Sequence, residues 1–504
     1  MENDQSLSNA DQQPPKTSAK ADHHCFHVHS SPRTLSYSWG RYKPKSRKEK
    51  ISLSYMLIFM VLLVISCSGP ANKGANLVAH TTPTQIVTIT RQSGNATSQP
   101  THGQPIRTST TTWAPINASF PGLADTTDNI HIGLPFDFNT NPPAMAGKID
   151  VVWGTNWARS LPGNIYSLFY LPYDRDEDTS NYLAAHPIVW YKANHPDWIE
   201  YKCDRSTVAY EYGDVNSVPL DITNPAVDSY IEGTYIASVL RPGSGYQGIG
   251  FDNLDFENAG DWTGQRCGHY TTDGNWVQQF SGTADDAAYR QSVLTWAQQM
   301  HYFIHIRFPQ AVMAVNFSYD PNFASDSNIL SNYVDFYIDE QGFTNGNNAS
   351  PTSPSTWYFT DSTWSGKINW IQNTLHLRHG FFSINQEPVP FANVTNDQVQ
   401  WVLANYLLVK NNASFLYICG EQQYGYAFLR PEYAAQIGSP LDALYQNQGI
   451  YLRDFTNGVA IVNPSSSFTY TLLLPGAGYK DLYGNVLRSP LIMPAHSGLV
   501  LIGS

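Results

Sequence analysis

The chain has 504 residues, enough for two or three domains, and its 42% hydrophobic content is compatible with a large buried core. Its formal net charge of −12 argues against a nucleic-acid partner, because an acidic surface repels a phosphate backbone. Aromatic residues make up 13% of the sequence, but many β-rich proteins use aromatics for packing, so this content does not by itself indicate a ligand.

Residues 1–67 are expected to be a cytoplasmic leader and a lipoprotein signal peptide. A basic run at 41–50 precedes the apolar stretch MLIFMVLLVI at 56–65. This stretch is short for a membrane span, which needs roughly 20 residues, but it suits the core of a signal peptide. The sequence VISC at 64–67 resembles the bacterial lipobox, which implies lipidation of Cys67 and anchoring at the extracellular face of the cell membrane. An uncleaved anchor and a plain signal peptide are the alternatives.

Residues 68–145 are expected to be a disordered linker with a lead-in segment. Between 69 and 112 the chain consists mainly of Thr, Ser, Gln, Asn, Gly and Pro, with very few charged residues. Such a segment cannot bury enough apolar surface to fold. We expect it to hold the rest of the protein away from the membrane.

Residues 146–440 predict an α/β domain, because short β-branched and aromatic runs alternate with helical stretches. Asn224-Pro225 and Thr395 are typical of helix starts. Eight alternating strands favour a (β/α)8 TIM barrel over an open doubly wound sheet, which would carry a glycine-rich phosphate loop after its first strand. The expected strands are 148–156, 165–173, 217–223, 246–256, 311–317, 334–343, 380–385 and 414–421.

Residues 441–504 contain short strand-like runs separated by turn residues, with no helical stretch. This pattern predicts a small antiparallel β-sandwich as a separate C-terminal domain.

Two of the five cysteines, Cys203 and Cys267, lie in loop-like stretches, and the chain has no C-x-x-C pair. If the body is exported to an oxidising compartment, these two could form a disulfide. Two free thiols are the alternative.

Acidic residues at the ends of two predicted strands carry the main chemical signal. The chemistry of a TIM barrel lies at the C-terminal ends of its strands, and Asp252 and Glu340 end the fourth and sixth. Two carboxyl groups can bracket a glycosidic bond, because one protonates the leaving oxygen and the other attacks the sugar or activates water. Alternation does not decide whether Asp339 or Glu340 faces the cleft, since strand ends often bulge. A helix cap or a salt bridge is the structural alternative for each acid.

Further residues near strand ends are candidates for contacting a substrate, although each could instead serve packing or capping. They are Asp255, Asp221, Asn316, Trp153, Tyr173, Phe343 and Glu421. No metal or cofactor is expected, because none of the histidines at 131, 186, 195, 269, 301 and 305 sits at a clear strand end with a carboxylate partner.

Several motifs together resemble a known family. The stretches HPDWIEYKCD, VPLDITNPAVDSYI and GIGFDNLDF are similar to hypothetical TIM-barrel glycosyl hydrolases related to the polygalactosaminidase-like hydrolases. VDFYIDEQGF looks like that family's second acidic strand, and the C-terminal residues look like the β-sandwich that often closes such barrels. The resemblance covers roughly 145–504. One departure is Gln247, which stands where an Asp is common.

The resemblance implies a glycosidase that acts on an extracellular polysaccharide or oligosaccharide, with Asp252 and Glu340 as its catalytic groups. We expect a monomer and favour a retaining mechanism, with Asp252 as nucleophile and a partly buried Glu340 as acid/base. A non-catalytic carbohydrate-binding lipoprotein is one alternative, and it predicts aromatic platforms without converging acids. A metal-dependent polysaccharide deacetylase is another, and it would need clustered histidine ligands.

Overall fold

A computed structural model describes residues 85–88, 130–136, 147–154, 165–177, 186–259, 264–346, 354–376, 379–421, 423–426, 428–474 and 478–503. The chain divides into two compact units, Met1–Ala79 and His80–Ser504, and all described residues belong to the second. The expected signal peptide and Cys67 lie outside these ranges. Within the described ranges, no helix combines the length and the hydropathy needed to cross a bilayer.

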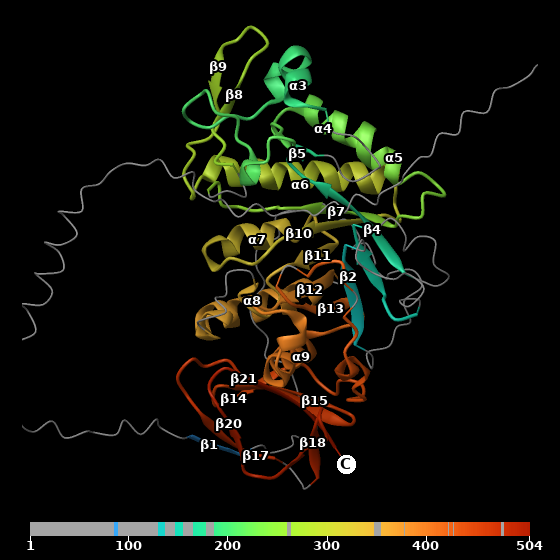
Figure 1. The fold of residues 1–504 in the computed structure, drawn as a ribbon, viewed down its shortest axis with the longest axis vertical. Coiled ribbons are helices and arrows are strands. Elements are labelled where there is room, and N and C mark those ends of the chain that lie inside the picture. Colours follow the sequence, from blue (N-terminus) through green and yellow to red (C-terminus); the bar gives the residue numbers. More distant parts are fainter. Residues whose placement is uncertain are drawn as a thin grey trace, which may run out of the picture. The chain divides into compact units, whose positions relative to one another are not determined.

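A closed barrel of eight parallel strands forms the centre of the second unit (Figure 1), which confirms the predicted fold class. Neighbouring barrel strands follow one another in chain order, and the last strand pairs with the first to close the barrel. Almost every strand residue is buried, as expected for strands enclosed by helices. The strands are β2 (His131–Pro135), β3 (Val151–Trp153), β4 (Tyr166–Pro172), β7 (Gly248–Asp252), β10 (Val312–Asn316), β11 (Phe336–Asp339), β12 (Gly380–Gln386) and β13 (Ser414–Cys419).

The barrel differs from the sequence-based expectation in two places. Its first strand is β2, which lies before residue 146 and pairs with β3 and β13. The expected strand at 217–223 does not enter the barrel, because β6 (Val218–Pro219) pairs only with β5 (Arg175–Asp176) in a separate two-stranded sheet. Pro219 lacks the N–H that an inner strand must donate, whereas an edge position tolerates it.

Two of the helices that cover the barrel begin at capping residues that the sequence indicated. Asn224 accepts a hydrogen bond from the backbone N–H of Ala226 at 3.0 Å, and Thr395 forms a capping box with Gln398. The main helices are α4 (Pro225–Ile231), α5 (Ala237–Val239), α6 (Ala287–Arg307), α7 (Ala324–Leu330), α8 (Asp361–His376) and α9 (Asn396–Val409).

Two segments that flank β7 in sequence form a region that we call the insertion, residues 186–224 and 264–280. It contains α3 (Ile188–Asn194) and the hairpin of β8 (Gly268–Tyr270) and β9 (Trp276–Gln278), which lie near each other at the top of Figure 1. The predicted disulfide between Cys203 and Cys267 joins the two segments, with their Cα atoms 5.1 Å apart.

The C-terminal residues form two sheets around a second apolar core, in line with the predicted sandwich. The strand β1 (Gln85–Thr88), from the expected linker, pairs in parallel with β17 and so belongs to this domain. One sheet comprises β1, β17 (Tyr470–Leu473) and β20 (Leu491–Met493). The other comprises β14 (Tyr445–Asn447), β15 (Ile450–Phe455), β16 (Gly458–Asn463), β21 (Ser497–Ile502), β18 (Tyr479–Asp481) and β19 (Val486–Leu487).

The sandwich packs directly against α9 of the barrel. Gly498 of β21 lies so close that a Cβ there would stand 2.7 Å from the Cα of Trp401, so the position needs glycine for lack of space. The backbone N–H of Val500 donates to Oε1 of Gln400 at 2.9 Å. Barrel and sandwich therefore share one closely packed interface.

Candidate active site

Asp252 is the last residue of β7, at the C-terminal end of the barrel, and its carboxylate is held in one orientation. Its Oδ1 accepts a hydrogen bond from Nδ2 of Asn316 at 2.7 Å, and its Oδ2 accepts one from the hydroxyl of Tyr170 at 2.7 Å. Asn316 ends β10 and Tyr170 lies on β4, so both strands adjacent to β7 contribute to fixing it. The side chain is mostly buried.

Glu340 follows β11 and is half-buried. Burial, reinforced by the negative charge of Asp252, raises the pKa of Glu340 to about 8, while hydrogen bonding with Asn316 acts in the opposite direction. Asn316 therefore contacts both carboxyl groups, and the structure brings together the two acids singled out in the sequence.

Asp339, the neighbour of Glu340, points into the protein and is fully buried. Its Oδ2 lies 2.7 Å from Nζ of Lys367 on α8, and its Oδ1 accepts a hydrogen bond from the hydroxyl of Ser318 at 2.9 Å. The backbone N–H of Gln341 also donates to Oδ1, at 3.0 Å. The two adjacent acids thus have separate roles: Asp339 anchors the strand end, and Glu340 is the one beside Asp252.

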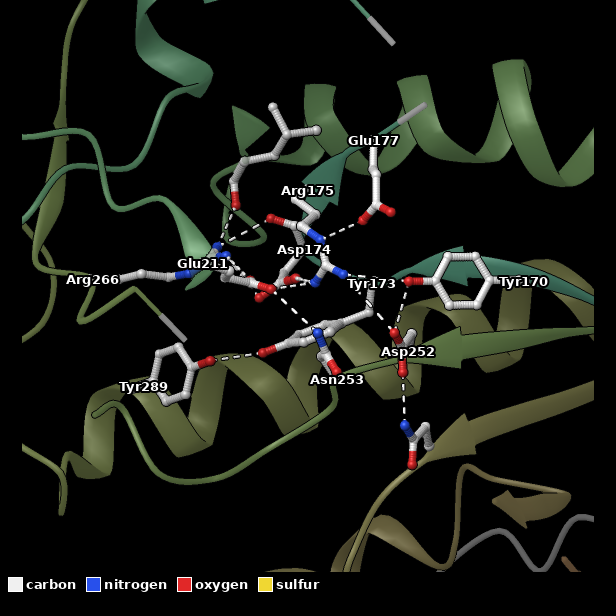
Figure 2. A network of polar contacts seen from close by, with 12 residues as sticks. Tyr170, Tyr173, Asp174, Arg175, Glu177, Glu211, Asp252, Asn253, Arg266 and Tyr289 are labelled. Atoms are coloured by element: carbon white, nitrogen blue, oxygen red, sulfur yellow. Dashed lines mark hydrogen bonds and ion pairs between the residues drawn. The ribbon is translucent and has the colours of Figure 1, made fainter. Parts of the chain in front are cut away.

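A buried arginine connects Asp252 to a polar network (Figure 2). Arg175 lies on β5, and its Nη2 is 3.4 Å from the Tyr170 hydroxyl and 3.9 Å from Oδ2 of Asp252. The same guanidinium forms ion pairs with Glu211 and, at 2.8 Å, with Glu177. The positively charged guanidinium of Arg175 therefore lies close to the Asp252 carboxylate.

A second buried arginine completes this network from the insertion. Nη2 of Arg266 lies 2.9 Å from Oε1 of Glu211 and 2.7 Å from Oδ2 of Asp174, and its Nη1 donates to the backbone carbonyl of Leu220 at 3.0 Å. None of these residues was expected from the sequence. The run YDRDE at 173–177, where a predicted strand ends, could have indicated Asp174, Arg175 and Glu177, but no local pattern pointed to Glu211 or Arg266.

Two tyrosines lie close to the paired acids. Tyr212 is 49% exposed and has a positive φ of 50°. Partial desolvation, followed by the charges of Asp252 and Glu340, raises its pKa. Burial and the charge of Glu340 likewise raise the pKa of Tyr424. Tyr212 was not expected from the sequence, because its loop carries no strand or helix pattern.

Three aromatic residues proposed as substrate contacts are buried in the protein. Trp153 is fully buried, and its Nε1 donates to the carbonyl of Gly250 at 3.0 Å. The hydroxyl of Tyr173 lies 2.7 Å from that of Tyr289. Phe343 is also buried, within the main apolar core. In this conformation a substrate does not reach these side chains, because packing encloses them.

The three remaining acids lie outside the Asp252–Glu340 pair. Asp255 accepts a hydrogen bond from the backbone N–H of Glu257 at 2.9 Å, and burial raises its pKa to about 6. Glu421 is exposed. Asp221 is buried in the insertion, where its Oδ2 lies 3.0 Å from Nδ1 of His269.

Among the histidines expected to have no carboxylate partner at a strand end, His131 at the start of β2 has its Nδ1 3.3 Å from Oδ2 of Asp150. His269 and His305 also have carboxylate partners, with Nε2 of His305 2.9 Å from Oδ2 of Asp335, although neither histidine ends a strand of the barrel. Both pairs join segments that are distant in the sequence, so chain position alone could not indicate them.

No family model matches the chain, and no curated protein matches it. Solved structures that resemble it include the Eubacterium rectale protein Amy13B, at 9% identity and a TM-score of 0.39, covering 76% of this chain and 97% of that one. An alpha-amylase from Lactobacillus plantarum matches at 10% identity and a TM-score of 0.37, covering 75% of this chain and 98% of that one. The Flavobacterium johnsoniae GH31 dextranase FjDex31A matches at 10% identity and a TM-score of 0.41, covering 75% of this chain and 52% of that one. Likenesses this distant do not reveal the chemistry of the site.

Proposed function

We propose that this chain is a glycoside hydrolase that cleaves O-glycosidic bonds of an extracellular polysaccharide or oligosaccharide. The observation that carries the proposal is the convergence of Asp252 and Glu340 on Asn316 at the C-terminal ends of β7, β10 and β11. Two carboxyl groups at this end of a barrel, in unlike environments, are what glycoside hydrolysis requires.

The environments of the two acids favour different roles. Glu340, with its raised pKa, keeps its proton at neutral pH and can donate it to the leaving glycosidic oxygen. Asp252 is oriented by Tyr170 and Asn316 and has Arg175 behind it, which suits a nucleophile that attacks the anomeric carbon. In the second half of the reaction, Glu340 would take a proton from a water molecule as that water attacks the anomeric carbon. This attack would break the bond between the sugar and Asp252 and release the sugar with retained configuration.

The test is a glycan panel assayed with the wild type, Asp252→Asn, Glu340→Gln and the exposed control Asp273→Asn. We expect the first two substitutions to lower kcat/KM at least about 100-fold, the scale of a lost acid/base group, while the control stays active. NMR of the first-formed product anomer tests retention. Hydrolysis that both acid variants retain undiminished, or a wild type that binds glycans but cleaves none, contradicts the proposal.

We also propose that the protein is exported and lipid-anchored through Cys67. The lipobox-like VISC supports this, and so does the Cys203–Cys267 disulfide, since such bonds persist in oxidising compartments. Cys67→Ser is expected to abolish metabolic lipid labelling and to move the protein out of the detergent-extracted membrane fraction. Unchanged labelling of that variant would contradict the anchor.

A further inference from the structure

Three potential metal ligands from distant parts of the sequence meet in the insertion. Glu200 lies in the segment after α3, Asp221 follows β6, and His269 lies on β8. One ligand atom from each residue lies within 4.8 Å of the other two. Nδ1 of His269 and Oδ2 of Asp221 are 3.0 Å apart. The arrangement is therefore a compact group of two carboxylates and one imidazole.

The burial of the Glu200 side chain is not explained by hydrogen bonds from neighbouring donor groups. Glu200 is 1% exposed, yet among the described residues no amide, hydroxyl or guanidinium donates a hydrogen bond to its carboxylate oxygens, and its side chain hydrogen-bonds instead with the Asp221 carboxyl group. Two buried carboxyl groups in contact are costly to ionise together, so a positive charge bound between them would stabilise the pair.

The nearest arginine does not supply that charge by direct contact. Nη2 of Arg266 already lies 2.7 Å from Asp174 and 2.9 Å from Glu211. Its Nη1 donates to the backbone carbonyls of Asp174 and Leu220. Its guanidinium is thus committed to the network beside the active site.

Asp221 is oriented as a metal ligand would be. Its Oδ1 accepts hydrogen bonds from the backbone N–H and the hydroxyl of Thr223, at 2.8 and 2.7 Å. Its Oδ2 faces His269 and accepts one from Nε2 of Gln279 at 2.9 Å. Hydrogen bonds of this kind fix the direction of a coordinating carboxylate.

We propose that Glu200, Asp221 and His269 bind one divalent transition-metal ion, with Zn²⁺ as the preferred occupant. An imidazole nitrogen combined with two carboxylates suits Zn²⁺ better than Ca²⁺ or Mg²⁺, which prefer oxygen ligands alone. The ion would offset the negative charge of the two adjacent carboxylates, Glu200 and Asp221. It would also link the two segments of the insertion, which the Cys203–Cys267 disulfide joins at another point.

A second cluster provides an internal comparison. His301, His305 and Asp335 also lie within 4.8 Å of one another. There, however, Oδ2 of Asp335 already accepts a hydrogen bond from the backbone N–H of Met313 at 2.8 Å and lies 2.9 Å from His305. Nδ1 of His301 lies 3.0 Å from the carbonyl of Tyr333. In contrast to Glu200, no carboxylate oxygen of Asp335 is buried without a donor among the described residues, so this cluster does not need an ion.

The test uses the full chain, stripped with EDTA and titrated with Zn²⁺ by calorimetry, with Ca²⁺ as a comparison. The measured quantity is the difference between the wild type and each variant, because the histidine-rich residues 23–29 could also bind zinc in every sample. We expect Glu200→Gln and His269→Gln each to lose one equivalent of tight Zn²⁺ binding and the accompanying rise in Tm. The control His301→Gln should keep both, and Ca²⁺ should have no effect.

X-ray absorption of the Zn²⁺-loaded wild type keeps the proposal testable if a variant fails to fold. For the one equivalent of Zn²⁺ that stays bound when the sample is diluted, the proposal requires a coordination shell of one imidazole and oxygen ligands. A shell of two imidazoles, or Zn²⁺ binding that is lost in His301→Gln but kept in Glu200→Gln, would overturn it. Equal Zn²⁺ response in the wild type and Glu200→Gln would also overturn it, and Glu200 and Asp221 would then be a carboxyl pair that shares a proton.

Discussion

At the scale of single residues, Glu340 ties stability to pH. Its pKa is about 8 in the folded protein, against 4.5 as the ordinary value, so the folded state binds the extra proton between these pH values. Stability from this group therefore falls as the pH rises through that window. We expect Glu340→Gln to flatten the decline and to raise the unfolding midpoint at pH 8, as measured by denaturant unfolding between pH 5 and 9.

The activity of the wild type should fall at the alkaline end of this pH range, because the proposed acid, Glu340, loses its proton as the pH passes about 8. Asp273→Asn, which changes an exposed acid, should reproduce the wild-type stability profile. Identical slopes for the wild type and Glu340→Gln would mean that this carboxyl has an ordinary pKa.

We expect the Tyr212 side chain to contact the substrate from the solvent-exposed side of the site. It is half-exposed and senses the charges of Asp252 and Glu340, so its ring lies near the reacting groups. We expect Tyr212→Ala to raise KM about 2- to 10-fold with a smaller change in kcat, the scale of one ring contact, and Tyr212→Phe to behave like the wild type. A loss of kcat in the phenylalanine variant would instead assign a proton-transfer role to the hydroxyl.

The sequence predicted which strand ends carry the acids, but not which of two adjacent acids faces the cleft. The direction of Asp339 depends on Lys367 from α8, a contact between residues that sequence spacing does not relate. Arg175 was missed for the same reason, since its partners Glu211 and Asp252 come from other parts of the chain. Local patterns locate ionisable groups, whereas tertiary contacts decide their roles.

At the scale of elements, helix starts were easier to predict than short strands. The caps at Asn224 and Thr395 use hydrogen bonds within a few residues, so the local sequence contains the necessary information. The strand β2 has only five residues and depends on β3 and β13 for its pairing. The run at 217–223 has strand-like composition because it is buried, but it is buried in the insertion rather than in the barrel wall.

At the scale of the whole molecule, the sandwich covers the last helix of the barrel, α9. Nearly all of α9 is buried, and Nη1 of Arg453 on β15 donates to the carbonyls of Leu407 and Lys410, at 3.1 and 2.8 Å, near the end of that helix. Removing residues 441–504 would expose this apolar face and leave those carbonyls without their donor. We expect the fragment 1–440 to aggregate, as measured by its soluble yield and by size-exclusion chromatography.

The control for this truncation is the full chain with Arg453→Lys, which keeps the sandwich but loses part of the helix-end contact. It should remain soluble with a lower Tm. A monodisperse, active 1–440 fragment would show that the two domains are independent.

The pairing of β2 with β13 also has a consequence for the order in which the protein is made. These strands lie at opposite ends of the barrel sequence, and their ladder is the seam that seals it. A nascent chain cannot form that seam until Ser414–Cys419 has been synthesised, so the emerging polypeptide presents open sheet edges throughout most of translation. Such late completion would suit a polypeptide that must be threaded unfolded through a translocation pore before it matures outside.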